Sequence, residues 1–357
     1  MVIGRQVAHA STVNDATAAS TQSSAPAAIT GRGSRNPAGN SGGTFSVGGP
    51  FGDIAFTVTD PRCAYLGGVQ EAPSTVVDIT DPADPRVDDF RDLNSVDRRP
   101  DLPGGKGLVI AEGVLVVQRM LASRFTPHAF LGTDRRLAEL SADLAGVPIP
   151  FYRASAEVMS EVVGFHLNRG VLGAARRPAE LGVADVLAGA RTVAVLEGVN
   201  DHENLGSVFR NAAGLGVDGV IFGAGCADPL YRRAVRVSMG HALLVPFARA
   251  ENWPADLYRL RDNGFRLLAM TPNAGSRVLA EMADELSGQK VAVLVGAEGP
   301  GLTDAALRAA DARVRIPMSR GTDSLNVATA AALAFYERVR RRVDDAAEGR
   351  GGGGARQ

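Results

Sequence analysis

Two glycine-containing loops near the C-terminus hold the residues with the clearest capacity for chemistry. The first loop runs from Gly296 to Gly301 and carries Glu298, and the second, which begins near Ile316, ends in Ser324-Leu-Asn326. Glycine lets the backbone approach a ligand closely, so both loops can offer N–H groups beside a few polar side chains. By themselves, these loops predict a ligand-binding site without naming the ligand.

A third candidate group lies on a helix predicted over 205–214, with Asn204 just before it. At about 100° per residue, the apolar side chains of this helix fall on one half. The other half holds small residues around a single arginine, Arg210. Small neighbours leave room for a large partner, and arginine suits a phosphate or a carboxylate ligand. An arginine paired with a structural carboxylate would explain the same pattern, and the helix alone leaves both interpretations open.

Predicted strands must position these residues. Lys290–Gly296 is an apolar, β-branched run typical of a strand buried on both faces, and Ala312–Met318 is a shorter strand that opens the second loop. Strands alternating with helices predict an α/β fold with a mainly parallel sheet covered on both faces, whose ligands bind at the strand ends. The other predicted strands are Val193–Val199, Val217–Gly223, Ala242–Phe247 and Phe265–Thr271.

Helices are expected between these strands, one of them capped by Asp228-Pro229, and the last over about Ser324–Arg342. Gly214–Gly219 matches the glycine spacing of a dinucleotide-binding loop, but it closes a helix and opens a strand. The fingerprint requires the opposite order, so we interpret this stretch as a helix end and a turn.

Domain organisation follows from composition. Residues 1–75 are rich in Ser, Thr, Ala, Gly and Pro and are expected to be a disordered extension. Residues 76–178 alternate short strands and helices and predict a small α/β sandwich domain. Residues 179–188 are expected to be a linker, 189–343 the second domain, and 344–357 a disordered Gly-rich tail.

The front domain holds more arginines than its core needs. A solvated face and an RNA-contacting face both explain this excess, and the sequence leaves the choice open. The residues concerned are Arg98, Arg99, Arg124, Arg135, Arg136, Arg153 and Arg169.

Bulk properties exclude several classes of protein. A net charge of −1 and a pI near 6.5 exclude a protein that binds nucleic acid through a strongly basic overall surface. Any RNA contact must therefore come from local arginine patches. Cys63 and Cys226 lie far apart without metal-ligand spacing, which favours a reduced cytoplasmic protein without a metal. No apolar run reaches membrane-spanning length, and the N-terminus lacks the apolar segment of a signal peptide.

Three blocks stand in order: Asn204–Gly216, Leu294–Leu302 and Ile316–Ala328. Together they resemble the three motifs of the SpoU (TrmH) family of RNA ribose 2′-O-methyltransferases, and Val237–Gly240 resembles the family's Ser-x-Gly stretch. The resemblance covers about residues 190–342.

A weaker resemblance covers residues 100–178, which are similar to a small RNA-binding domain that many family members share with some ribosomal proteins. Its cues are Ala111-Glu112-Gly113 and Arg169-Gly170-Val171. The family usually places a histidine next to the Gly-Val pair, whereas His166 precedes it by several residues here.

The resemblance implies a trefoil-knotted fold and a homodimer that shares its active sites. It also implies S-adenosyl-L-methionine as the cofactor, with Thr271, Gly296, Ile316, Met318 and Leu325 forming its cradle. The apolar members of that set could instead be simple core residues. No metal and no membrane are implied.

The resemblance also assigns catalytic roles. Arg210 would position the 2′-oxygen or a phosphate and stabilise developing negative charge, because an arginine is a poor base. Asn204 would orient Arg210 or the substrate, and Glu298 would anchor the arginine or accept a hydrogen bond. Ser324 and Asn326 stand at a helix start, where one residue can cap the helix while the other faces the site.

The predicted function is therefore methyl transfer from S-adenosylmethionine to a ribose 2′-hydroxyl in RNA, with rRNA preferred over tRNA. A non-enzymatic RNA-binding or ribosome-assembly factor on the same fold is the alternative. Base methylation by a related knotted enzyme is the third hypothesis.

Overall fold

The computed structural model describes residues 43–47, 54–58, 75–95, 100–101 and 105–351. The chain divides into two compact units, Met1–Gln70 and Glu71–Gln357. In the first unit, β1 (Gly43–Val47) and β2 (Ile54–Val58) pair antiparallel. These two strands correct the expectation of disorder across 1–75 at their positions, and nearly all the rest of that stretch lies outside the described residues.

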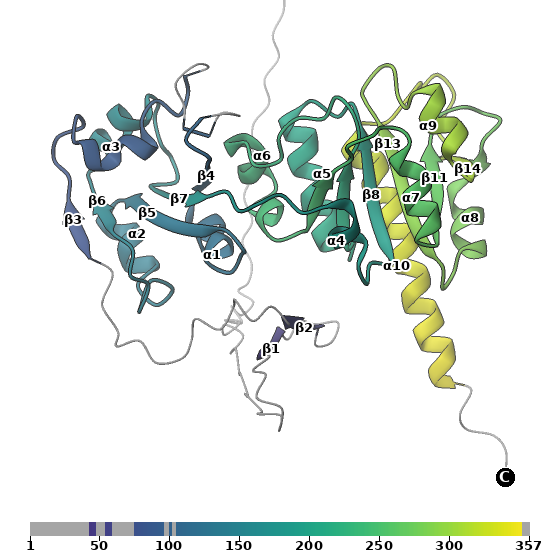
Figure 1. Ribbon diagram of the computed structural model, residues 1–357, viewed down its shortest axis with the longest axis horizontal. Helices are drawn as coiled ribbons and strands as arrows, with labels where there is room; N and C mark the ends of the chain where they lie inside the picture. The colour runs from purple at the N-terminus through teal and green to yellow at the C-terminus, as the bar shows by residue number, and fades with distance from the viewer. Residues whose placement is uncertain (1–42, 48–53, 59–74, 96–99, 102–104, 352–357) are drawn as a thin grey trace, which may run out of the picture. The chain divides into compact units, whose positions relative to one another are not determined.

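The second unit contains a seven-stranded sheet in the order β10-β9-β8-β13-β11-β14-β12, in which every neighbouring pair is parallel (Figure 1). This confirms the predicted α/β class. The strands are β8 (Thr192–Glu197), β9 (Gly219–Phe222), β10 (Phe247–Arg249), β11 (Phe265–Met270), β12 (Arg277–Val278), β13 (Lys290–Gly296) and β14 (Ala312–Arg315).

Helices cover both faces of this sheet, because the alternating side chains of its strands feed two separate apolar cores. One face is covered by α5 (His202–Gly214), α6 (Arg232–Val237), α8 (Leu279–Glu285) and α10 (Val327–Gly351). The opposite face is covered by α4 (Val183–Leu187), α7 (Asp256–Asp262) and α9 (Asp304–Ala309).

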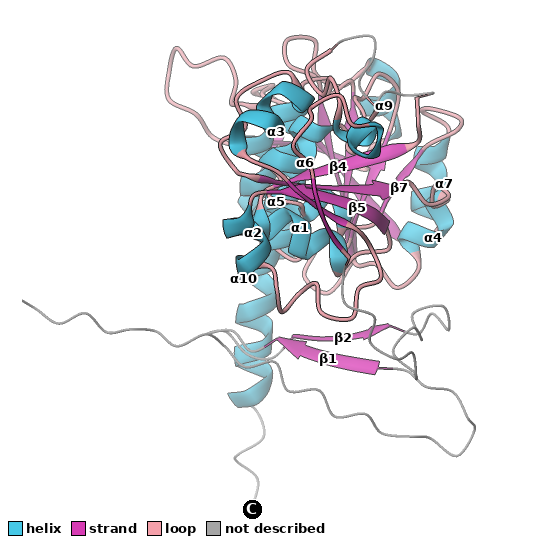
Figure 2. Ribbon diagram, turned by 90° about the vertical axis from the view of Figure 1, so that its left-hand side faces the viewer, coloured by secondary structure: helices cyan, strands magenta, loops and turns pink. Residues whose placement is uncertain are grey.

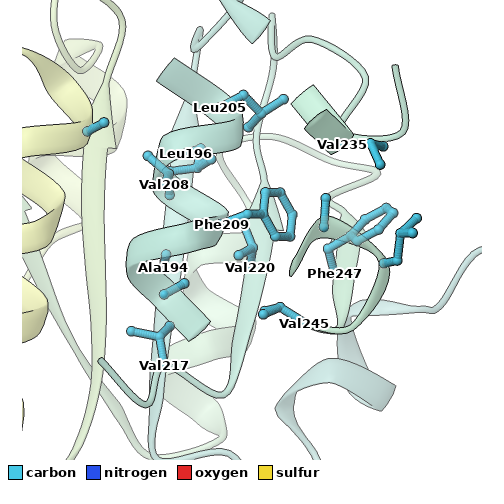
Figure 3. Close-up of a cluster of buried hydrophobic side chains, with 14 of the residues drawn as sticks. Ala194, Leu196, Leu205, Val208, Phe209, Val217, Val220, Val235, Val245 and Phe247 are labelled. Atoms are coloured by element: carbon cyan, nitrogen blue, oxygen red, sulfur yellow. The ribbon is translucent and has the colours of Figure 1, made fainter. Parts of the chain in front are cut away.

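Helix α5 is anchored by the apolar half that the sequence predicted. Phe209 is fully buried and faces Phe247 (Figure 3), and the two ring centroids are 5.8 Å apart. The Phe209 ring centroid also lies 6.1 Å from that of Phe222. Leu205 and Val208 pack beside it. Aromatic contacts of this kind add to the stabilisation from apolar burial, so the position of α5 against the sheet is well determined.

The front domain is a five-stranded mixed sheet in the order β3-β6-β5-β7-β4, and Figure 2 shows its strands β5, β7 and β4 side by side. Its elements are β3 (Val76–Asp78), η2 (Pro85–Phe90), β4 (Leu108–Glu112), α1 (Val114–Leu121), β5 (Thr126–Gly132), α2 (Asp134–Glu139), β6 (Phe151–Arg153), α3 (Ala156–Val163) and β7 (Val171–Arg176). Ser155 caps α3 as predicted, because its hydroxyl accepts a hydrogen bond from the Val158 N–H at 3.3 Å.

Several predicted boundaries were wrong. Most of Ala242–Phe247 is not a strand: a 3-10 turn, η3 (His241–Leu243), comes first, and β10 begins only at Phe247. The expected linker 179–188 contains helix α4, whose Val186 and Leu187 are buried in the core. Local pattern could not separate a short buried helix from a linker, because burial there depends on distant strands.

Two helix ends also differ from expectation. Asp228 does not cap α6; its carboxylate accepts from the Leu230 N–H and pairs with Arg177 at 2.6 Å. Helix α10 continues to Gly351, well into the predicted Gly-rich tail, of which 352–357 lie outside the described residues. The charged and alanine-rich residues before Gly351 favour helix more strongly than the nearby glycines oppose it.

Candidate functional site

A cavity of about 520 Å³ lies at the carboxyl ends of three neighbouring strands. Because β11 pairs in parallel with both β13 and β14, the loops that follow these strands emerge at the same sheet edge. All the residues predicted to hold a cofactor line this cavity, namely Thr271, Gly296, Ile316, Met318 and Leu325. The structure thus brings them together, and their role in binding stays a prediction.

The first glycine loop is shaped mainly by contacts with itself. A Cβ on Gly296 would lie 2.2 Å from the carbonyl carbon of Gly301, so a side chain there would collide with backbone. Gly299 and Gly301 have φ angles of +85° and +71°, which only glycine adopts without strain. The glycines are therefore needed for the tight turn itself. The backbone of that turn also lines the cavity.

The apolar walls are not simply core residues. Ile316 packs partly against the main core and also faces the cavity. Leu325 remains 36% exposed although it is apolar, and Met318 is half-buried. An exposed apolar side chain at the edge of a cavity is available to a ligand, which argues against the alternative that these residues only fill the core.

A polar network of three side chains, the Asn204–Glu298–Asn326 triad, joins α5 to both loops. Asn204 donates from Nδ2 to Oε1 of Glu298 at 2.9 Å. Asn326 donates from Nδ2 to Oδ1 of Asn204 at 2.7 Å and to Oε1 of Glu298 at 3.2 Å. Residues separated by 28 to 122 positions in the chain therefore hold one carboxylate in a defined orientation beside the cavity.

Asn326 has a second role as the cap of α10. Its Oδ1 accepts hydrogen bonds from the backbone N–H groups of Ala328 at 2.9 Å and Thr329 at 3.3 Å. Ser324 and Asn326 both lie on the cavity wall. The sequence predicted that one residue of this pair would cap the helix while the other faced the site. Asn326 caps α10 through its Oδ1, and its Nδ2 makes the hydrogen bonds of the triad.

Arg210 does not reach the cavity within one chain. It lies six residues beyond Asn204 on α5, about 9 Å further along the helix axis and on a different side. Its side chain is exposed, and its charged neighbours are Arg119 and His241. Burial, followed by the charges of Arg119 and Arg210, lowers the pKa of His241 to about 4.

The small residues around Arg210 have a different purpose from the one predicted. Gly206 is buried, and a Cβ there would lie 2.7 Å from the carbonyl oxygen of Ala234 on α6. The glycine thus lets two helices approach, rather than making room for a ligand. Asn211 donates from Nδ2 to the carbonyl oxygen of Ala328 at 3.0 Å and ties α5 to α10.

The sequence-based predictions gave no structural role to two buried glutamates, Glu197 and Glu112. Glu197 ends β8 and accepts hydrogen bonds from the Trp253 indole, from the Thr303 N–H at 2.8 Å and from the Thr303 hydroxyl at 2.9 Å. Glu112 ends β4 and pairs with Arg232 at 2.7 Å. Each is a single carboxylate directly after an apolar strand, which is the signal that could have found them.

Most described front-domain arginines from the predicted excess have partners. Arg153 bonds to Asp78 and Asp134, Arg136 to Glu139, and Arg124 to the carbonyl oxygen of Ala179. Arg135 lies 3.8 Å from the carboxylate of Glu139 but its side chain is 80% exposed, and Arg98 and Arg99 lie outside the described residues. The choice between a solvated and an RNA-contacting face therefore narrows to few side chains.

Comparison with known proteins decides the family. Residues 191–336 match the model of the SpoU rRNA Methylase family. An uncharacterized tRNA/rRNA methyltransferase of Mycobacterium bovis is 72% identical over 284 residues, which cover 79% of this chain and 97% of the relative. The chain belongs to the SpoU methylase family.

Two solved structures resemble this SpoU family member over most of its length. An AdoMet-bound rRNA methyltransferase from Sinorhizobium meliloti is 26% identical with a TM-score of 0.62, covering 75% of this chain and 98% of its own. A protein described as an RNA 2′-O ribose methyltransferase is 25% identical with a TM-score of 0.58, covering 75% and 100%. Both alignments are too long for the methylase domain alone.

The described residues hold no group of three or more His, Cys, Asp or Glu side chains arranged to bind a metal ion. In the same part of the chain, no helix combines the length and the apolar character needed to cross a bilayer.

Proposed function

We propose that this SpoU family member is an S-adenosylmethionine-dependent RNA methyltransferase that modifies a ribose 2′-hydroxyl, with rRNA preferred over tRNA. The observation that carries the proposal is the Asn204–Glu298–Asn326 triad beside the cavity of about 520 Å³. The names of the two structural relatives, one AdoMet-bound and one a 2′-O ribose methyltransferase, support the same reaction.

The cavity suits the cofactor in size and chemistry. Its volume falls within the range of about 300 to 1,000 Å³ typical of small-molecule sites. Ile316, Met318 and Leu325 would pack against apolar parts of the molecule, while backbone near Gly296 and Thr271 would meet its polar edges. Bound S-adenosylmethionine would supply an activated methyl group on a sulfonium for nucleophilic displacement.

The triad would orient the acceptor. Glu298 is held by two amides that both donate to Oε1, so its Oε2 keeps acceptor capacity. Glu298 can accept a hydrogen bond from the ribose hydroxyl and keep the oxygen in line, which lowers the barrier by holding the reacting atoms in an attack geometry. Ser324 lies on the same cavity wall and could contact either ligand.

Arg210 would act from a partner subunit. Within one chain it lies away from the cavity, and the proposed reaction needs a cation near the ribose or its phosphate. A homodimer that brings this arginine to the partner's cavity would meet the need. We further propose that the chain through the 296–301 and 316–326 loops is threaded as a trefoil knot and that the protein works in the cytoplasm.

Methyl transfer to RNA is the direct test. The protein is incubated with bulk rRNA or bulk tRNA and labelled cofactor, and the product is digested to nucleosides. Label on ribose in rRNA is expected. Label on a base would replace the proposed acceptor atom, and label only in tRNA would replace the preferred substrate.

Absence of label in every RNA pool, with cofactor binding demonstrated by calorimetry, would refute the enzymatic proposal. A Glu298→Ala variant separates catalysis from the RNA-binding alternative, because Glu298 belongs to the triad beside the cavity. It should lose most transfer activity while a cellular role that depends only on binding would persist.

A further inference from the structure

A second polar site lies where the front domain meets the methyltransferase domain. Helix α1 of the front domain packs against η3, which also contacts α5. The charges of Arg119 on α1 and Arg210 on α5 both act on His241 at the start of η3, which places these three side chains near one another at this junction. Arg119 lies more than 80 residues before both Arg210 and His241 in the chain, so the tertiary fold alone brings it to them.

The Arg119 guanidinium is held in place by the stretch that resembles the family's Ser-x-Gly. Its Nη1 donates a hydrogen bond to the carbonyl oxygen of Met239. The following glycine makes the approach possible, since a Cβ on Gly240 would lie 3.3 Å from Cβ and Cδ of Arg119. Met239 and Gly240 have φ angles of +55° and +87°, so this turn is an unusual conformation that presents its carbonyl to α1.

Ser238 makes the turn rigid. It is fully buried, its hydroxyl donates to the carbonyl oxygen of Val235 at 2.9 Å, and the same oxygen accepts from the Ala242 N–H at 3.2 Å. This turn of the methyltransferase domain binds Arg119 of the front domain through the Met239 carbonyl. The bond orients the Arg119 guanidinium near Arg210 and His241.

The charges at this junction are unbalanced. Burial and the charge of Arg210 lower the pKa of Arg119, and no described carboxylate forms an ion pair with either arginine. Nearby arginines behave differently: Arg232 and Arg236 lie 2.7 and 3.7 Å from Glu112. Cations held together without a counter-charge favour an anionic ligand, and a guanidinium matches phosphate geometry.

We propose that Arg119, Arg210 and His241 form a binding site for a backbone phosphate of the substrate RNA at this junction. The inference rests on the proposed function for its choice of RNA as the ligand. Arg119 would be a positioning residue contributed by the front domain, which places the RNA relative to α5. His241 is neutral near pH 7 and can donate one N–H to a phosphate oxygen.

Salt-dependent RNA binding tests this site in the full-length protein. Binding of a fluorescein-labelled single-stranded RNA of mixed sequence is followed by anisotropy at several KCl concentrations. Arg119→Gln keeps a donor for the Met239 carbonyl but removes the charge. It should weaken binding roughly fivefold or more and reduce the slope of log K against log salt by about 0.7, the value for one lost phosphate contact on a single strand.

Two further variants control for charge and fold. Arg119→Lys should recover most of the salt slope, since it restores the cation. Arg308→Gln makes the same charge change on α9, which covers the opposite face of the sheet, and should leave both affinity and slope close to those of the wild type. Melting temperatures of all variants report any general loss of structure.

The outcomes separate this inference from the proposed function. If Arg119→Gln binds RNA with the wild-type slope, or if Arg308→Gln loses as much slope, the phosphate site is refuted. If the wild-type protein transfers no methyl group while Arg119 still controls the salt slope, the site stands and the proposed reaction fails. In a working enzyme, Arg119→Gln should raise KM for bulk rRNA by more than it lowers kcat.

Discussion

Two glutamates, each held at the carboxyl end of a strand or just beyond it, show how environment divides their roles. Glu298 is exposed and is bonded by the amides of Asn204 and Asn326. Glu112 is 4% exposed and lies among Arg232, Arg236 and Arg169. Amides orient a carboxylate and leave its charge intact, whereas guanidiniums neutralise it and permit burial.

The difference separates a candidate ligand-binding site at Glu298 from a structural contact between two domains at Glu112. Glu112 on β4 and Arg232 on α6 connect the front domain to the methyltransferase domain, and Arg232 also stacks on Phe165 with its guanidinium carbon 4.6 Å from the ring centroid. A buried ion pair of this kind gives little net stability but is costly to break. Glu298 carries no such structural obligation, so its carboxylate is available to a substrate.

The largest effect is expected from Glu112→Gln, which removes the carboxylate that pairs with the buried Arg232 guanidinium. The free energy of unfolding should fall by about 3 to 5 kcal/mol, and urea denaturation followed by circular dichroism measures it. Replacing both partners, as Glu112→Met with Arg232→Met, should recover most of the loss. If the free energy of unfolding of the single variant changed by less than about 0.5 kcal/mol, as is typical of a surface pair, Glu112 would not be a structural contact between the domains.

Glu298→Ala tests the other side of the comparison. Loss of two hydrogen bonds to a carboxylate should lower kcat for RNA methylation by roughly 10- to 100-fold, because both amides lose their anchor. Stability should change by less than about 1 kcal/mol, since the side chain is exposed. Steady-state kinetics with thermal melts compare the two readouts, and a stability loss as large as that of Glu112→Gln would remove the distinction.

Glu197 is an intermediate case, buried like Glu112 but held by neutral donors like Glu298. Thr303→Val removes a hydroxyl that both bonds Glu197 and caps α9 by accepting from the Ala306 N–H at 3.2 Å. A loss of about 1 to 2 kcal/mol in the free energy of unfolding is expected. Chemical denaturation would show it, and an unchanged midpoint would mean that the Trp253 and backbone bonds suffice.

The smallest effect concerns pH. His241 has a pKa of about 4 in the folded protein and 6.5 as an ordinary value, with the Arg119 and Arg210 charges facing it. The unfolded chain therefore binds more protons between these values, so this contribution to stability falls as pH drops from about 6.5 to about 4. His241→Gln should flatten that part of the stability profile, and an identical profile for both proteins would contradict the assignment.

Sequence and structure agree most closely where strong local patterns repeat. The apolar runs of β8, β11 and β13 identified buried parallel strands, because burial on both faces demands continuous apolar residues. Ser155 marked the start of α3 through its own short-range hydrogen bond. The segment around Ala242 failed because its apolar residues fill a turn between packed elements, and apolar composition alone does not distinguish a turn from a strand.

The residues of the candidate site were identifiable from the chain alone, since glycine loops after apolar strands and an Asn-bearing helix start carry their chemistry in local pattern. Their grouping was not. Which strand neighbours which is set by long-range pairing, so only the tertiary structure placed Asn204 against Glu298 and Asn326, and Arg210 beside Arg119 instead of the cavity. Periodicity records which face of an element is buried, whereas contacts between distant faces depend on how the whole chain packs.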